Sequence, residues 1–259
     1  MRQRTDSHPF STMSRLTTLS LRKFSLLASA AALWVGTVAN GATITWGTAT
    51  AVSTGPGNSS DVSTNGTLVE AYSGTQTDNS QLSQTVNGVT FIASTTLLNG
   101  NSINQGDMSS ATNGGDAAYD AILSTLDFGG GDSTTIVIGD GDGNTGTLST
   151  GLLTVGLQYE IQVWFVDDRA GSNYDSRVMG YASSSSDTVV QLNDQFVIGT
   201  FTADATTQTL FLDTISPSSG FGNTHITAYQ IRQIPEPSVP ALIAGLFGLT
   251  SLRRRRFGS

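Results

Sequence analysis

The sequence predicts an all-β protein whose body is an antiparallel β-sandwich of jelly-roll type with one short helix. Short apolar runs rich in Val, Ile and Thr alternate with turn-forming Gly, Asn and Ser, which is typical of such sandwiches. Only one internal segment has the apolar spacing of a helix. The chain has 259 residues and no cysteine, so packing rather than disulfides must hold this body together.

One hairpin stands out among the predicted strands. Asn87-Gly88 separates the short runs 84–86 and 89–91, and both turn residues tolerate the positive φ that a two-residue hairpin needs. The other strands that we expect cover residues 43–46, 67–72, 89–93, 134–138, 159–166, 195–202, 209–212 and 225–231.

The strand at 159–166 has the clearest pattern. Its alternate residues Tyr159, Ile161, Val163 and Phe165 share one face. Trp164 and Val166 make the opposite face partly apolar as well, as in a strand that is covered on both sides.

Residues 116–126 break the β pattern. Tyr119, Ile122, Leu123 and Leu126 fall at positions i, i+3, i+4 and i+7, which predicts a short amphipathic helix against the sandwich. Asp116 is suited to cap its start, and the glycines at 129–131 end it.

The first 41 residues have the order of a secretory signal peptide. Arg22-Lys23 precedes an apolar run at 24–38, and the small residues at 39–41 suit signal peptidase. We expect a signal helix, cleavage before Ala42 or Thr43, and an alternative translation start at Met13.

Residues 233–259 have three parts in a fixed order. Pro235, Glu236 and Pro237 precede a 14-residue apolar run at 239–252, which is followed by Arg253, Arg254, Arg255 and Arg256. As a helix the run would reach about 21 Å, against a hydrocarbon core of about 30 Å. The arginines favour the cytoplasmic side of a membrane. We therefore expect a hydrophobic helix that serves as a weak, transient membrane anchor.

This Pro-Glu-Pro, apolar and arginine order resembles the PEP-CTERM sorting signal of exported bacterial proteins. The resemblance implies that the transient anchor is held in the inner membrane, that an exosortase-type membrane enzyme processes it, and that the protein reaches the cell surface or the extracellular matrix. The body, at 42–232, resembles sandwich domains of PEP-CTERM proteins in the segments 44–46, 86–91, 119–131, 153–156, 159–169 and 199–203. That likeness implies a non-catalytic domain distantly like carbohydrate-binding modules.

The body is strongly acidic. It contains 18 acidic and three basic residues, the latter Arg169, Arg177 and Arg232, which leaves a net charge of −15. Such a field repels nucleic acid and anionic lipid, so we expect neither as a partner.

The acidic run Asp140, Asp142 and Asn144 has the alternating oxygens of a calcium loop. Thr145 and Gly151 replace the glycine and glutamate that an EF-hand requires, so an EF-hand is excluded. A loosely bound calcium ion and a plain turn both remain open, and no other cofactor or metal is predicted.

A second polar cluster follows the strand at 159–166. Asp167, Asp168, Arg169, Tyr174 and Arg177 carry groups that hydrogen-bond sugar hydroxyls or stack on a sugar ring. The same residues could instead form an Arg–Asp network that fixes a long loop, and we favour this network.

The sequence offers little for catalysis. His225 is the only histidine of the body and lies in a predicted strand, and no nucleophile elbow or zinc motif is present. A pair of carboxylates, with Glu70 and Glu160 as candidates, stays open. In particular, Glu160 could face a concave sheet surface.

Together with the resemblance, these observations predict an exported, non-catalytic surface or matrix protein that binds exopolysaccharide. Signal peptidase and, as the resemblance implies, an exosortase are its expected processing partners. Two alternatives remain: a polysaccharide hydrolase or lyase of sandwich fold, and a purely structural component of a biofilm.

Overall fold

The computed structural model describes residues 41–74, 83–94, 97–98, 101–104, 115–129, 131–141, 151–167, 177–184, 187–216 and 223–235. Within these ranges every regular element is a strand, apart from the helix α1 (Ala117–Leu123) and the 3-10 turn η1 (Asn58–Asp61). The all-β prediction is therefore confirmed.

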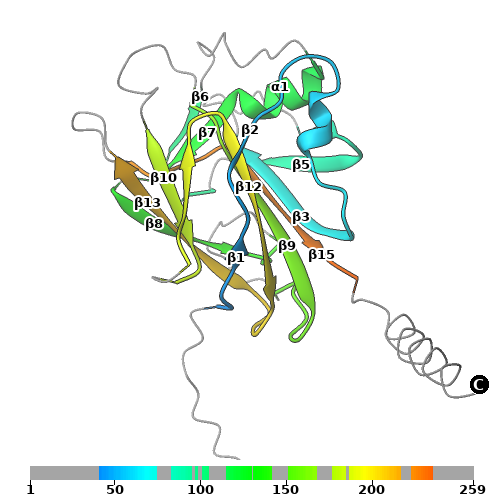
Figure 1. Ribbon diagram of the computed structural model, residues 1–259, viewed down its shortest axis with the longest axis vertical. Helices are drawn as coiled ribbons and strands as arrows, with labels where there is room; N and C mark the ends of the chain where they lie inside the picture. The colour runs from blue at the N-terminus through cyan, green and yellow to red at the C-terminus, as the bar shows by residue number, and fades with distance from the viewer. Residues whose placement is uncertain are drawn as a thin grey trace, which may run out of the picture. The chain divides into compact units, whose positions relative to one another are not determined.

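The largest sheet has the strand order β1-β12-β9-β15-β3-β5-β4, with β2 paired to β12 (Figure 1). Its strands are β1 (Thr45–Trp46), β2 (Thr50–Ala51), β3 (Thr67–Gly74), β4 (Gln84–Val86), β5 (Val89–Ser94), β9 (Gln158–Phe165), β12 (Gln195–Thr202) and β15 (Ala228–Gln233). All of its neighbours are antiparallel except β3 and β5, which run parallel. The expected wholly antiparallel pairing is wrong at this point, because β5 rather than β4 lies beside β3.

Two smaller antiparallel sheets complete the fold. The second sheet has the order β11-β10-β13-β8, and the third has the order β14-β7-β6. Their strands are β6 (Asn101–Asn104), β7 (Thr125–Phe128), β8 (Ser133–Ile138), β10 (Val178–Ala182), β11 (Val189–Leu192), β13 (Gln208–Ser216) and β14 (His225–Ile226).

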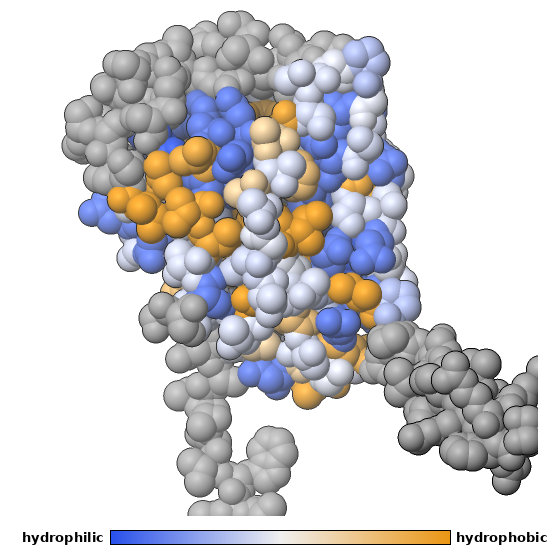
Figure 2. Space-filling model, viewed as in Figure 1, coloured by the Kyte–Doolittle hydropathy of each residue, from blue (hydrophilic) through white to orange (hydrophobic). Residues whose placement is uncertain are grey.

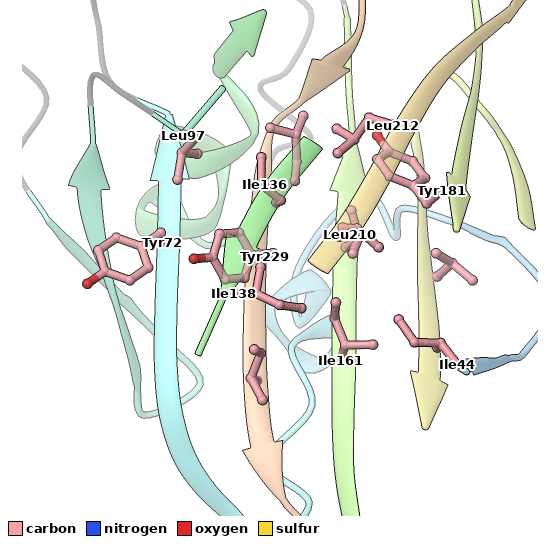
Figure 3. Packing of buried hydrophobic residues seen from close by; sticks show 14 of the residues in the cluster. Ile44, Tyr72, Leu97, Ile136, Ile138, Ile161, Tyr181, Leu210, Leu212 and Tyr229 are labelled. Carbon is pink, nitrogen blue, oxygen red and sulfur yellow. The ribbon is translucent and has the colours of Figure 1, made fainter. Parts of the chain in front are cut away.

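The main and second sheets pack face to face around an apolar core. The inward side chains of β9 are Tyr159, Ile161, Val163 and Phe165, as predicted. They share one cluster of buried residues with Ile136, Ile138, Tyr181, Leu210 and Leu212 of the second sheet (Figure 3). Each of these side chains is at most 1% exposed, so this interface is the centre of the hydrophobic core.

The opposite face of the main sheet is buried as well, as the apolar Trp164 and Val166 predicted. Trp164 packs edge-on against Phe91, with ring centroids 5.6 Å apart. Its indole N–H donates to the Tyr119 hydroxyl of α1 at 2.9 Å. Helix α1 therefore covers this face and joins β9 through an aromatic hydrogen bond.

The predicted helix exists but is shorter than expected. Asp116 caps its start, because its Oδ1 accepts from the backbone N–H groups of Ala118 at 2.9 Å and Tyr119 at 3.3 Å. The helix ends at Leu123, whereas the prediction ran to Leu126. Leu126 instead lies in β7, because the chain turns to pair with β6 and β14.

The predicted hairpin is confirmed. Asn87 and Gly88 have φ values of 48° and 77°, which suit a two-residue turn between antiparallel strands. The prediction of a single strand at 225–231 is wrong, because Thr227 separates two strands, β14 and β15. β14 joins the third sheet and β15 joins the main sheet, while the Thr227 N–H donates to the Trp164 carbonyl at 3.0 Å.

Both terminal predictions lie outside the described residues, namely the signal helix before residue 41 and the hydrophobic helix after Pro235. Within the described ranges, no helix has the length and apolarity needed to cross a bilayer.

The second sheet exposes aliphatic side chains on its outer side. Val190 and Leu192 of β11 and Ile215 of β13 are 49%, 53% and 49% exposed. Figure 2 shows apolar side chains gathered over the region where Figure 1 places β10 and β13. Leu192 is therefore an exposed leucine that can serve as a control for substitutions of the buried leucines of the core.

Asp187 ties the first strand to the second sheet. Its carboxylate accepts from the backbone N–H of Ile44 at 3.0 Å and from Ser184 N–H at 2.7 Å, and it also contacts the Ser183 hydroxyl. Burial raises the pKa of Asp187, but the hydrogen bonds from Ser183, Ile44 and Ser184 outweigh burial and lower it. The ionised carboxylate is therefore the form that the fold stabilises.

Replacing Leu210 with Ala should lower the free energy of unfolding by about 2–5 kcal/mol, because a fully buried side chain leaves a cavity. The same change at Leu192, which is 53% exposed, should alter it by less than about 0.5 kcal/mol. Urea unfolding of the two variants checks this, and equal losses would contradict the assignment of the core.

Replacing Asp187 with Asn should lower stability at neutral pH and leave little difference in acid. A carboxylate with a lowered folded-state pKa stabilises the fold above its unfolded pKa, and this contribution disappears as pH falls through the folded pKa. Urea midpoints of both proteins, measured between neutral pH and strong acid, test this. A constant difference at all pH values would show that ionisation plays no part.

Candidate functional site

A buried ion pair fixes the two ends of the loop that the sequence singled out. Asp167 follows β9 and Arg177 precedes β10, and Arg177 Nη1 lies 3.3 Å from Asp167 Oδ2. The two side chains are 0% and 3% exposed, respectively. The structure therefore brings Asp167 and Arg177 together, while Asp168, Arg169 and Tyr174 lie outside the described residues.

His225 is the third member of this buried cluster. Arg177 Nη1 lies 3.1 Å from Nδ1 of His225 and also contacts Nε2. Because a guanidinium group only donates, one of the two imidazole nitrogens must act as the acceptor, and the tautomer of His225 decides which one. The ring lies against Phe128 and Phe165, with centroids 6.2 Å and 6.3 Å away.

The backbone around the cluster is held by further hydrogen bonds. The amide of Asn193 accepts from Asp167 N–H at 2.5 Å and donates to the Asp167 carbonyl at 3.0 Å. The Tyr181 hydroxyl donates to the His225 carbonyl at 2.8 Å. Burial raises the pKa of Tyr181, so this hydroxyl keeps the proton that it donates.

The sequence pattern missed His225 and Asn193 as members of this cluster. His225 lies 48 positions from Arg177, and Asn193 lies 26 positions from Asp167. Nothing in local spacing signals such contacts, although the scarcity of histidine in the body did single out His225. The cluster is thus the network that we favoured for Asp167 and Arg177, enlarged by two residues.

Glu70 binds the start of the segment for which the sequence left a loosely bound calcium ion and a plain turn open. The backbone N–H groups of Gly139 and Gly141 donate to its carboxylate at 2.5 and 3.0 Å, and the Tyr229 hydroxyl donates at 3.1 Å. Both glycines have a φ of 77°, a conformation that favours glycine and turns their N–H groups toward the carboxylate.

Asp140 lies within this turn and is buried, whereas Asp142 and Asn144 lie outside the described residues. Burial raises the pKa of Tyr229, and the negative charges of Glu70 and Asp140 raise it further. Across the described ranges, no three His, Cys, Asp or Glu side chains come together in a metal-binding group. The calcium candidate stays a prediction.

Glu160 lies under a loop rather than on an open sheet surface. It contacts the Ser63 hydroxyl and accepts from the Asn65 side chain at 3.2 Å. Arg232, opposite Glu160 on β15, donates to the carbonyls of Asn65 and Gly66, both at 2.9 Å. Burial lowers the pKa of Arg232, and the carboxylate of Glu160 acts in the opposite direction.

Two glutamines extend this contact between loop and sheet. Gln162 accepts from the backbone N–H of Ser63 at 3.0 Å and donates to the Asp61 carbonyl at 2.7 Å. Gln230 donates to the Ser63 carbonyl at 3.0 Å and to Gln162 at 2.8 Å. The polar face of the main sheet is therefore used to hold the loop at 61–66.

Glu70 and Glu160 do not form the carboxylate pair of a glycosidase. Glu70 is paired with Ile231 and Glu160 with Arg232, which are adjacent residues of β15. Adjacent strand residues point to opposite faces of a sheet. The two carboxylates therefore lie on opposite sides of the main sheet and cannot flank one glycosidic bond.

Comparisons with protein-family models, curated proteins and solved structures give no significant match for this chain. The described residues form an all-β fold of three sheets, two of which pack face to face, and the described candidate residues belong to buried hydrogen-bond networks.

Replacing Arg177 with Met should lower the free energy of unfolding by about 3–5 kcal/mol, because it removes the cation from a buried carboxylate. Adding Asp167→Leu should recover part of the loss, which gives a positive coupling in a double-mutant cycle measured by urea unfolding. Strictly additive losses would show that the two side chains do not depend on one another.

Proposed function

We propose that this chain is an exported, non-catalytic protein of the cell surface or extracellular matrix, sorted by its C-terminal signal. The observation that carries the proposal is the order Pro235-Glu236-Pro237, the apolar run 239–252 and the arginines 253–256. The apolar run holds the chain in the inner membrane, the arginines keep its end in the cytoplasm, and an exosortase-type enzyme processes it.

The body supports a structural rather than a catalytic role. Glu70, Glu160, Asp167, Arg177 and His225 are each at most 7% exposed. Each of them contacts other groups of the fold. Within this proposal the two packed sheets form a sandwich of the jelly-roll type.

Exopolysaccharide is the partner that we propose for the mature protein. The large apolar side chains that are exposed in the described ranges are all aliphatic. Because sugar rings stack best on aromatic rings, we assign sugar contact to Tyr174 and Arg169 of the loop that begins at Asp167.

Replacing the four arginines 253–256 with Gln should reduce retention of the precursor in the inner membrane, because the tail loses the charges that keep its end in the cytoplasm. Cell fractionation followed by intact-mass measurement reads this out. The wild-type chain should reach the surface without its terminal segment. Full-length protein with both ends uncut in the cytosol would overturn the proposal.

Binding of the exported protein to a glycan array, with and without calcium, tests the proposed partner. Tyr174→Ala should abolish retention of any bound polysaccharide, because the stacking ring is lost. Val155→Ala, an exposed position 58% accessible, serves as the control and should bind like the wild type. Equal binding by all three proteins would remove this loop from the proposal, and no binding by any would remove the glycan.

A further inference from the structure

A polar side chain begins the inward-facing row of β13. Gln208 points to the same face as Leu210 and Leu212, since alternate residues of a strand share a face. It is 1% exposed, and the two leucines are fully buried. A buried amide in such a row must find hydrogen-bond partners, because leaving it unpaired costs free energy.

Both ends of this amide are hydrogen-bonded, and one of them bonds the start of the described chain. Gln208 Nε2 donates to the Thr209 carbonyl at 2.9 Å, which turns Oε1 toward the first residues of the body. Oε1 accepts from the backbone N–H of Ala42 at 2.8 Å. Ala42 itself packs against the inter-sheet core, so it belongs to the folded body.

Gly41 directly precedes Ala42, the residue that Gln208 binds. Its φ is +83°, and a Cβ at this position would lie 2.8 Å from Cδ of Gln208. In a continuous chain, any other residue at position 41 would therefore be strained by the positive φ and would displace the Gln208 side chain. Gly41 and Ala39 also occupy the small-residue positions that signal peptidase recognises when it cuts before Ala42.

We propose that signal peptidase cuts between Gly41 and Ala42, and that the Gln208 side chain forms a binding site for the new amino terminus. Water hydrolyses the peptide bond, so Gly41 leaves with the carboxylate and Ala42 keeps the nitrogen as an ammonium group. This group donates to Gln208 Oε1 from the position of the Ala42 nitrogen. The inference rests on the proposed export of the chain.

Two features favour an ammonium group at this place. A charged donor makes a stronger hydrogen bond to the amide oxygen than a peptide N–H does. The body also has a net charge of −15, and the carboxylate of Asp187 binds the chain only two residues further on, at Ile44. Cleavage before Thr43 would instead remove Ala42, the donor that Gln208 accepts from.

The first test is the amino-terminal sequence and intact mass of the protein exported from cells that express the full chain. The expected first residue is Ala42. A first residue of Gly41, Thr43 or any other position overturns this inference alone, because export has still occurred. An uncut chain retained in the cell overturns the inference together with the proposed function.

Gly41→Ala provides a matched control, since alanine suits signal peptidase but not the positive φ of the uncut fold. The exported variant should have the same mass and the same urea midpoint as the wild type, because residue 41 has been removed. A mass increase of one methylene group and a lower midpoint would show that residue 41 is retained.

The absence of lysine after Lys23 allows a direct test of the Gln208 binding site. The amino terminus is then the only amine of the mature protein, so acetylation removes one charge selectively. Acetylation should lower the urea midpoint of the wild type and leave that of Gln208→Met, already lower, unchanged. An equal shift in both proteins would overturn the role of Gln208.

Discussion

The burial of β9 on both of its faces is the constraint on which the other layers depend. Its alternate residues from Tyr159 to Phe165 form the middle of the inter-sheet core, so the second sheet must lie against them. Trp164 and Glu160 point the other way and require a second cover, which α1 and the loop at 61–66 provide. Because a strand has only two faces, one sequence segment thus determines the position of three layers.

The acidic residues of the body also stabilise its structure through hydrogen bonds. The carboxylates of Glu70, Asp116 and Asp187 accept hydrogen bonds from backbone N–H groups that turns and helix ends leave without a ladder partner. The carboxylate of Asp167 instead forms a buried ion pair with Arg177, which joins the chain after β9 to the chain before β10. In a domain without disulfides, such contacts fix loops and strand ends that apolar packing alone would leave undirected.

The sequence predicted those parts of the fold in which local chemistry decides the outcome. Strand β12 has the predicted bounds, and the Asn87-Gly88 turn follows from backbone preferences. Leu126 was misplaced because its helical spacing continued into a segment that pairs with other strands. Strands β10 and β11 escaped prediction because they are short and adjoin a serine tract. The contact of Arg177 with His225 joins distant segments, which periodicity cannot reveal.

The position of strand β15 also has a mechanical consequence for the described domain. It is the last strand of the described chain, yet it lies in the middle of the main sheet, between β9 and β3. A force that pulls along β15 from beyond Pro235, against the rest of the sheet, therefore acts in shear on the ladders on both sides of the strand. Many hydrogen bonds resist such a load together, whereas a strand at an edge would peel away one bond at a time. A domain tethered through this end is suited to bearing tension.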